Sequence, residues 1–352
     1  MTTDQPIPIL DDVSRVQSVD TKGMLRLINE LPEQCETALG IGRNYVVEPL
    51  ETKPNMVFIT GVGDSGIAGD MTAAILSEEI DVPVESDHGG RLPKCVGEES
   101  LVLVVDYSGK SETTLRNYKD AKQRNATVIC ITSGGKLMEA ASKDGTKIIK
   151  ILPGQPKRTA LGYQFVPLIT VMEQCGLVSG LIEKLSYAIK LLKNVREALR
   201  FENRTDRNVA KQAALALAGK PITIFGAPGY RAVIAGRYRI QFSANSKTPS
   251  SSSTFPNVVE GEIAGWELAE KNNRDYGFVF LRDKDDKTEI TDQMIISADL
   301  LKNFGIVDLD IKGATIMEKM LYGIYLGDYI SLYLALLNEV DPTITASVTF
   351  IE

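Results

Sequence analysis

The sequence is poor in the residue types from which metal sites and histidine-based catalytic sites are built. Among its 352 residues there are one histidine, one tryptophan and four cysteines. The cysteines are scattered without a C-x-x-C pair, at Cys35, Cys95, Cys130 and Cys175. This arrangement indicates neither a zinc site nor a disulfide framework. We expect no metal and no cofactor, and a Ser-His-Asp triad would have to be built around His88.

A surplus of positive charge is also missing. The 39 lysines and arginines stand against 46 aspartates and glutamates, for a net charge of −7. A surface for nucleic acid or anionic membrane needs a basic patch, so we expect neither partner. The N-terminus has no basic region followed by an apolar one, and no apolar run reaches the ~20 residues of a membrane span. With its unpaired cysteines, the chain is expected in the cytoplasm.

What the sequence does contain is a repeated α/β pattern, and its length suggests two domains. In the first round, strands are expected at 56–60, 82–85, 101–105, 126–132 and 146–151, and helices near 65–79, 111–124 and 135–142. In the second, strands are expected at 222–225, 249–254, 277–282 and 305–310, and helices near 230–244, 290–302 and 314–337. Such alternation predicts mainly parallel sheets with helices on both faces.

The predicted organisation is a helical lead-in, a first domain, a linking helix and a second domain, at 1–40, 41–177, 178–206 and 207–352 respectively. Within the lead-in, Asp20 or Thr21 is expected to cap a helix that ends near Pro32. The serine run 250–253 has the composition of a linker, but its short length also fits an ordered strand edge, which we favour.

Two stretches in the first domain have the geometry of an anion site. Residues 61–70, GVGDSGIAGD, follow the strand 56–60, and residues 106–112, DYSGKSE, follow the strand 101–105. A glycine turn that leads from a strand into a helix presents backbone N–H groups and the positive end of the helix dipole. Two such turns on neighbouring parallel strands are expected to meet at one ligand at the carboxyl edge of the sheet.

Five segments together resemble the sugar isomerase (SIS) family, and most closely the bifunctional phosphoglucose/phosphomannose isomerases. They are GVGDSGIAGD, DYSGKSETTL, LPGQPKRTALGY, PNVVEGEIAGWE and GDYISLYLALLNEVDPT, in this order and spacing. The resemblance covers residues 40–343. It implies two SIS-type three-layer αβα domains and an aldose–ketose isomerase that converts glucose 6-phosphate or mannose 6-phosphate to fructose 6-phosphate. It also implies a homodimer with the site near the interface.

The resemblance implies six residues that bind the sugar phosphate: Ser65, Asp64, Asp106, Ser108, Ser111 and Arg158. Asp64 and Asp106 stand where the family has glycine and serine. The serines are also expected at these places as simple helix N-caps. Asp64 is expected either in the pocket or pointing to solvent, and Arg158 either on the phosphate or in an ion pair with Asp106.

The family's three catalytic positions are substituted. Ala244 stands at the position of the base, Glu260 at that of the histidine, and Glu352 at or near that of the lysine. Glu260 and Glu262 are therefore the candidate catalytic residues, and Glu260 would act as a base if it were buried. The alternative is a non-catalytic SIS paralogue that binds a carbohydrate derivative as a sensor or regulator. A further alternative is a site for a cationic or neutral ligand, or for a metal held by Asp64 and Asp106.

Two other features are assigned structural roles. Tyrosines at helical spacing, at 322, 325, 329 and 333, are expected in the core or at a dimer interface, as is Trp266. The apolar length of 314–337 suits burial against a partner subunit. His88 lies in a loop after a strand and matches no catalytic position of the family, so we expect an exposed or satisfied structural histidine.

Overall fold

The computed structural model describes residues 9–271 and 275–345, which form two compact units. We call them the first-sheet unit, residues 30–190, and the second-sheet unit, residues 1–29 and 191–352. The division falls inside helix α8, Leu181–Leu199, which lies within the predicted linking segment. Glu352, predicted near the family's catalytic lysine, lies outside the described residues. The limits predicted for the individual domains stay predictions.

The N-terminal helices are divided between the two units. The second-sheet unit contains η1 (Ile9–Asp11), α1 (Val13–Val19) and α2 (Met24–Asn29), and the first-sheet unit contains α3 (Leu31–Asn44). The Asp20 carboxylate accepts hydrogen bonds from the backbone N–H groups of Met24 and Leu25, at 2.6 and 2.8 Å, as expected for a cap. This helix, α2, ends at Asn29, three residues before Pro32, so the predicted end is confirmed. Pro32 itself lies in the first turn of the next helix, α3, where its missing N–H costs no hydrogen bond.

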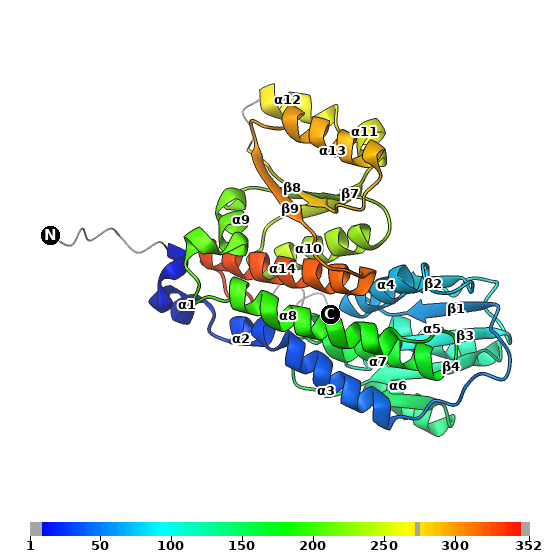
Figure 1. Cartoon of the computed structure of the whole chain (residues 1–352). Coiled ribbons are helices and arrows are strands. Elements are labelled where there is room, and N and C mark those ends of the chain that lie inside the picture. Colours follow the sequence, from blue (N-terminus) through cyan, green and yellow to red (C-terminus); the bar gives the residue numbers. More distant parts are fainter. Residues whose placement is uncertain (1–8, 272–274, 346–352) are drawn as a thin grey trace. The chain divides into compact units, whose positions relative to one another are not determined.

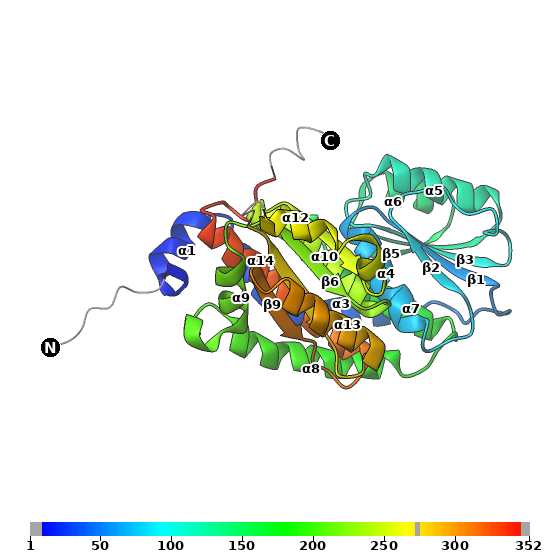
Figure 2. The ribbon, with the colours of Figure 1, turned by 90° about the horizontal axis from the view of Figure 1, so that it is seen from above.

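The first sheet is parallel throughout, with strand order β2-β1-β3-β4-β5. The strands are β1 (Met56–Thr60), β2 (Val84–Asp87), β3 (Ser100–Asp106), β4 (Thr127–Thr132) and β5 (Lys147–Lys150). Helices α3, α4 (Asp64–Leu76) and α7 (Leu161–Gln174) cover one face, and α5 (Glu112–Gln123) and α6 (Gly135–Lys143) cover the other (Figure 2). β1 and β3 are buried along their whole length, which explains their unbroken apolar sequences.

The second sheet is also parallel and has the order β7-β6-β8-β9. Its strands are β6 (Ile222–Gly226), β7 (Ser250–Thr254), β8 (Gly277–Arg282) and β9 (Gly305–Asp310). One face carries α9 (Val209–Leu217), α10 (Tyr230–Ser246) and α14 (Ile316–Leu337), and the other α11 (Asn257–Gly261), α12 (Gly265–Lys271) and α13 (Thr288–Leu300) (Figure 1). The serine run forms the edge strand β7, so the ordered alternative is confirmed. Two short 3-10 helices, η2 (Lys157–Thr159) and η3 (Thr205–Arg207), complete the described elements.

Helix α14 is the core helix of the second-sheet unit. It is the one described helix that is long and apolar enough to cross a membrane, but 94% of its most apolar 18-residue window is buried inside the protein. Its tyrosines bond within the unit: Tyr325 and Tyr329 donate to Asn29, and Tyr333 donates to the Leu199 carbonyl at 2.5 Å. The tyrosine stripe is therefore core, as one alternative predicted. The expectation that this helix is buried against a partner subunit was wrong, because its own unit covers it.

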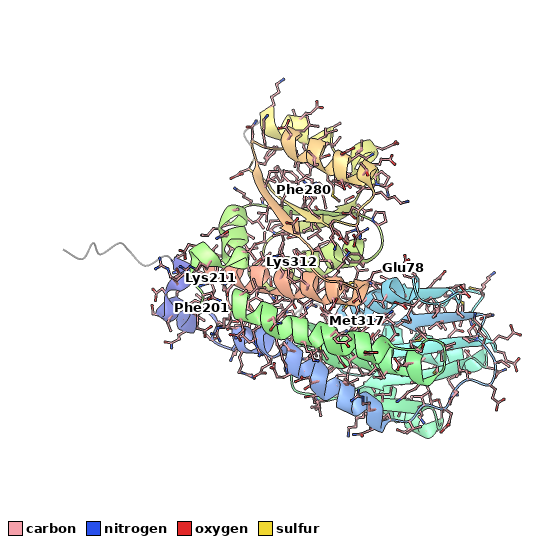
Figure 3. All side chains as sticks on the ribbon, viewed as in Figure 1. Glu78, Phe201, Lys211, Phe280, Lys312 and Met317 are labelled. Atoms are coloured by element: carbon pink, nitrogen blue, oxygen red, sulfur yellow. The ribbon has the colours of Figure 1, made fainter. Side chains whose placement is uncertain are left out.

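A buried lysine fastens the N-terminal segment to the rest of the second-sheet unit. Figure 3 labels Lys211 beside Phe201, and the Lys211 ammonium lies 4.5 Å from the centre of that ring. The ammonium donates to Asp11 at 2.8 Å and to the carbonyls of Phe201 and Asn203. Burial opposes ionisation of Asp11, but hydrogen bonds from Lys211 and Thr205 outweigh it and hold the pKa of Asp11 below its usual value. A fully bonded charge of this kind is stable in the interior.

Candidate functional site

The two predicted anion-site turns leave neighbouring strands of the first sheet. Thr60, at the end of β1, pairs with Val104 near the end of β3, so both turns start at the same carboxyl edge. The turn after β1 leads through Gly63 into α4, and no side chain caps the N-terminus of this helix. The second leads through Ser111 into α5. The structure therefore brings the two turns together, as the sequence predicted, and leaves backbone N–H groups of α4 for a ligand.

Asp106 closes the second turn from within. It is 1% exposed, and its two carboxylate oxygens accept hydrogen bonds from the Ser111 backbone N–H at 2.8 Å and from the Ser108 hydroxyl at 3.3 Å. Donors of the turn itself therefore already compensate the Asp106 charge, and the pairing of Asp106 with Arg158 stays a prediction.

The three serines have three different environments. Ser111 is the N-cap of α5 and accepts from the Thr114 N–H at 3.2 Å, so the simple capping role is confirmed for this residue. Ser108 is exposed at the tip of its turn. Ser65 is fully buried and donates to the side-chain oxygen of Gln164 at 2.6 Å. Of the three serines, Ser108 is therefore the most exposed to a ligand.

Gln164 and Tyr107 position the turns, and sequence reasoning missed both. The Gln164 amide nitrogen donates to the carbonyls of Lys157 and Ala160, each at 3.1 Å, which connects the start of α4 to the segment that carries Arg158. The Tyr107 hydroxyl accepts from the Gln155 N–H at 3.1 Å, and burial raises the pKa of Tyr107. The sequence offered one signal: Gln164 is a polar residue in the otherwise apolar run of α7.

Arg158 and Asp64 lie at the same edge. Arg158 is largely buried in η2, and Asp64 is the partly exposed first residue of α4. Both have interactions with other parts of the chain. Five of the six predicted substrate-binding residues therefore lie in or directly after the two turns, and the sixth follows β5 on the same sheet.

The chain's histidine is paired at this edge as well. The His88 Nε2 lies 2.7 Å from an Asp70 carboxylate oxygen, and the other oxygen of Asp70 accepts from the Ser86 hydroxyl at 2.5 Å. His88 directly follows β2, and Asp70 lies on α4. The prediction of an exposed or satisfied histidine is confirmed, because His88 is bonded to Asp70. Its location next to the turn that follows β1 was not predicted.

At the carboxyl edge of the second sheet, charged side chains of the chain itself occupy the place of a ligand. The fully buried Asp283 carboxylate accepts from the Lys319 ammonium at 2.8 and 2.9 Å and from the Tyr230 hydroxyl. Burial alone would lower the pKa of Lys319, but its hydrogen bonds to Asp283 and Asp285 outweigh burial and raise that pKa. An internal carboxylate here opposes a second anion, so the first sheet is the better place for a sugar phosphate.

The predicted catalytic glutamates belong to the second-sheet unit, whereas the predicted substrate-binding residues belong to the first-sheet unit. Glu260 is exposed on α11, so the burial on which its proposed role depended is not found in this chain. Glu262 is half-buried at the end of α11, and its backbone N–H donates to the Val258 carbonyl. Ala244 lies on α10 with no group that could take a proton. The role of the two glutamates stays a prediction.

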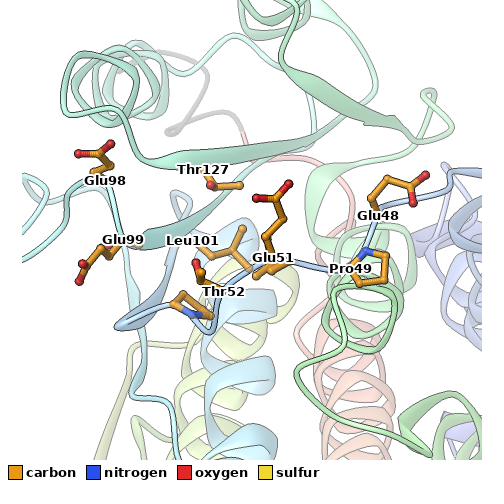
Figure 4. A pocket seen from close by; sticks show the side chains of 11 residues that line it. Glu48, Pro49, Glu51, Thr52, Glu98, Glu99, Leu101 and Thr127 are labelled. Carbon is orange, nitrogen blue, oxygen red and sulfur yellow. The ribbon is translucent and has the colours of Figure 1, made fainter.

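A hollow of about 390 Å³ lies at the opposite, amino edge of the first sheet (Figure 4). It is lined by the first residues of β3 and β4 and by four glutamates, Glu48, Glu51, Glu98 and Glu99. Four carboxylates oppose a dianionic ligand, so this hollow does not suit a sugar phosphate. Among the described residues, no group of three or more histidine, cysteine, aspartate or glutamate side chains could hold a metal ion.

Comparison with known proteins gives the same family for both halves of the chain. Residues 52–161 match the SIS domain, and residues 206–351 match the bacterial phospho-glucose isomerase C-terminal SIS domain. The fold is similar to that of a glucose-6-phosphate isomerase like protein from Thermus thermophilus, with a TM-score of 0.62, 18% identity and coverage of 96% of this chain and 99% of that one.

Relatives of known name extend the match over nearly the whole chain. The bifunctional phosphoglucose/phosphomannose isomerase of Aquifex aeolicus is 28% identical, over 81% of this chain and 86% of its own. The protein of the same name from Caldicellulosiruptor bescii is 36% identical over 322 residues, which are 91% of this chain and 95% of its own. With this similarity and two parallel-sheet units of SIS type, the chain belongs to the family of bifunctional phosphoglucose/phosphomannose isomerases.

Proposed function

We propose that the protein is an aldose–ketose isomerase that converts glucose 6-phosphate or mannose 6-phosphate to fructose 6-phosphate. The observation that carries this proposal is the 36% identity, over 91% of the chain, to a protein named for these two activities. The paired turns at the carboxyl edge of the first sheet support it, because they offer an uncapped helix start and an exposed hydroxyl to an anion. This proposal places the substrate in the first-sheet unit.

We assign the six predicted substrate-binding residues according to their contacts. Ser108 and the N–H groups at the start of α4 bind the phosphate directly, together with Arg158. Asp106 and Ser111 hold the second turn in its binding shape, since each already bonds within that turn. Ser65 fixes α4 through Gln164. Asp64, at the first position of α4, faces the sugar hydroxyls, where a carboxylate accepts hydrogen bonds without opposing the phosphate.

The isomerisation itself moves a proton between C2 and C1. A base takes the C2 proton, the electrons of that C–H bond form a C1–C2 double bond, and the C1 carbonyl oxygen takes up a proton to give the enediol. The C2 hydroxyl then loses its proton, its oxygen becomes the ketose carbonyl, and the electrons of the double bond take the base's proton at C1. No oxidant or cofactor is needed. We assign this transfer to Glu260 and Glu262, the carboxylates in the segment that matches the family's catalytic motif.

The first test is a coupled assay with purified protein and glucose 6-phosphate or mannose 6-phosphate. The wild type is expected to form fructose 6-phosphate, and Glu260→Gln or Glu262→Gln to lower kcat by about 10²–10⁴-fold, since each removes a general base. Glu267→Gln, on α12 in the same segment, is the matched control and should retain full activity. No product from either aldose would overturn the proposed activity, and binding without turnover would favour a sensor.

We also propose that the protein acts in the cytoplasm as a homodimer with the site near the interface. All four cysteines are free thiols, which is typical of a reducing compartment. On α13, Ile295, Ile296 and Leu300 are each more than half exposed, and Leu268 on α12 is too. Exposed apolar side chains gathered on neighbouring helices favour contact with a second copy.

Light scattering after gel filtration tests this dimer. The wild type is expected at twice the chain mass of 38.5 kDa, and the double variant I296E/L300E at the chain mass, because two charges cannot be buried in an apolar interface. Leu215→Glu, a similarly exposed leucine on α9, should leave the dimer intact. A monomeric wild type, or a dimeric double variant, would contradict the proposed interface.

A further inference from the structure

His88 and Asp70 form an oriented acid–base pair in the first-sheet unit. The His88 Nε2 lies 2.7 Å from Asp70, and the Ser86 hydroxyl holds the other carboxylate oxygen at 2.5 Å. Ser86 and His88 are two residues apart on β2 and its continuation, so both side chains point to the same face of the sheet, where α4 lies. The His88 side chain is 43% exposed and that of Asp70 25% exposed. A carboxylate with a fixed orientation therefore sets the position of an imidazole that is partly exposed at this edge.

The imidazole lies directly against the first turn of α4. A Cβ atom added to Gly66 would be 2.6 Å from the His88 Nδ1 and 2.8 Å from two of its ring carbons. The face of the ring therefore packs on the helix backbone, one residue beyond Ser65. Only glycine at position 66 allows this approach.

The segment after His88 lies between the two ligand turns. A Cβ atom on Gly89 would be 2.9 Å from Val62 of the first turn and 2.8 Å from Thr113 of the first turn of α5. The Asn117 side chain donates to both the Gly90 carbonyl and the Thr60 hydroxyl at 2.9 Å, which fixes the segment against the end of β1. His88 is thus held beside the place where the proposed function puts the sugar phosphate.

We propose that His88 is the catalytic acid–base residue that opens and closes the sugar ring, with Asp70 as its positioning residue. This proposal rests on the proposed isomerase function and adds a residue to it. Sugar phosphates are cyclic in solution, and C1 and C2 react only in the open chain, so ring opening must precede the proton transfer. It requires a second acid–base group besides the one at C1 and C2.

The ring-opening step conserves atoms and electrons. The imidazolium of His88 donates a proton to the ring oxygen while the bond between that oxygen and the anomeric carbon breaks, and the bonding electrons stay on the oxygen. Water takes the proton of the anomeric hydroxyl as the carbonyl forms. Ring closure reverses these steps. Asp70 stabilises the imidazolium and keeps the ring in one orientation, as a carboxylate does for other catalytic histidines.

Several charged groups surround the imidazole. Asp70 faces it from α4, and Arg116 of α5 donates to the carbonyls of Gly89 and Gly90. On the other side of β2, both carboxylate oxygens of Asp87 are buried without a hydrogen-bond partner among the described residues. Arg91 is exposed after this segment, and Asp64 is partly exposed at the start of α4.

The test compares two reactions of the wild type, H88Q, D70N and the control D120N. The first is isomerisation of glucose 6-phosphate, and the second is enzyme-catalysed exchange of its α and β anomers, followed by magnetisation-transfer NMR. H88Q is expected to lower both rates by about 10²-fold and to remove one ionisation from the pH profile of kcat/KM. D70N is expected to lower both by a smaller factor. D120N changes a carboxylate on α5 that pairs with Arg124, and should change neither rate.

Each outcome separates this proposal from the proposed function. If the wild type isomerises and H88Q retains both rates within twofold, the role of His88 is overturned and the isomerase function stands. Loss of isomerisation with unchanged anomer exchange in H88Q would also overturn the ring-opening role. If the wild type catalyses neither reaction, the isomerase function fails, and the role of His88 fails with it. Circular dichroism of H88Q and D70N excludes loss of the fold as the cause.

Discussion

Replacing Gly109 with alanine is expected to destabilise the first-sheet unit by about 2–5 kcal/mol and to abolish binding of fructose 6-phosphate. Gly109 has a positive φ of 66°, and a Cβ atom there would be 1.7 Å from the Gly134 carbonyl oxygen. The left-handed backbone costs an L-residue about 1–2 kcal/mol, and overpacking adds about 1–3 kcal/mol. Because the Leu137 N–H donates to the Gly109 carbonyl at 3.0 Å, the clash also separates the second turn from the start of α6.

Gly145→Ala is the matched control for this variant. Its φ of 65° is nearly the same, but no atom lies within 4 Å of the added Cβ, so only the backbone term of about 1–2 kcal/mol remains. Urea unfolding followed by far-UV circular dichroism gives the stability, and calorimetric titration with fructose 6-phosphate gives the affinity. Equal stability losses in the two variants, or normal binding by Gly109→Ala, would show that the two turns do not pack as described.

Asp328→Ala is expected to destabilise the second-sheet unit by about 3–5 kcal/mol, because it removes a carboxylate that accepts two hydrogen bonds from a buried arginine. Arg237 is fully buried on α10 and forms two hydrogen bonds, of 3.1 and 3.0 Å, to the Asp328 carboxylate on α14. Gln241 donates to the same carboxylate at 2.8 Å. This polar contact lies between the two long helices that cover one face of the second sheet.

The fluorescence of Trp266 during urea unfolding measures the stability of the second-sheet unit, in which Trp266 lies. Trp266 is the chain's single tryptophan and packs edge-on against Phe278 of β8, with ring centroids 4.8 Å apart. Asp299→Asn, which removes an exposed ion pair with Lys302, is the control and should change the stability by less than about 1 kcal/mol. A loss below about 1 kcal/mol in Asp328→Ala would mean that water or another group replaces the carboxylate.

The apolar pattern was sufficient to predict the buried strands. The strands 56–60, 277–282 and 305–310 have the predicted limits, and the other four strands of the first sheet differ from prediction by one or two residues at their ends. A parallel strand buried on both faces is a continuous apolar run, so its sequence identifies it without knowledge of its neighbours. Pro32 indicated the end of α2 but not the start of α3, because proline is as acceptable in the first turn of a helix as it is after the last.

The sequence predicted where the two turns lie, and predicted their side-chain contacts less well. Glycine and serine turns after apolar strands indicated that both turns lie at the carboxyl edge of the first sheet, because parallel strands all end there. Whether Asp106 pairs with Arg158 or with its own turn depends on distances of a few ångströms between segments about 50 residues apart. No local pattern contains that information.

The sequence by itself determined the family, the two parallel-sheet units and the edge at which a ligand is expected, since each depends on local apolar periodicity or on short motifs. Only the tertiary structure decided that α14 is buried in its own unit, that Asp283 and Lys319 fill the second edge, and that His88 lies on the backbone of Gly66 beside Asp70. These contacts join residues on different elements. Their energy depends on burial and distance, which exist only once the chain has folded.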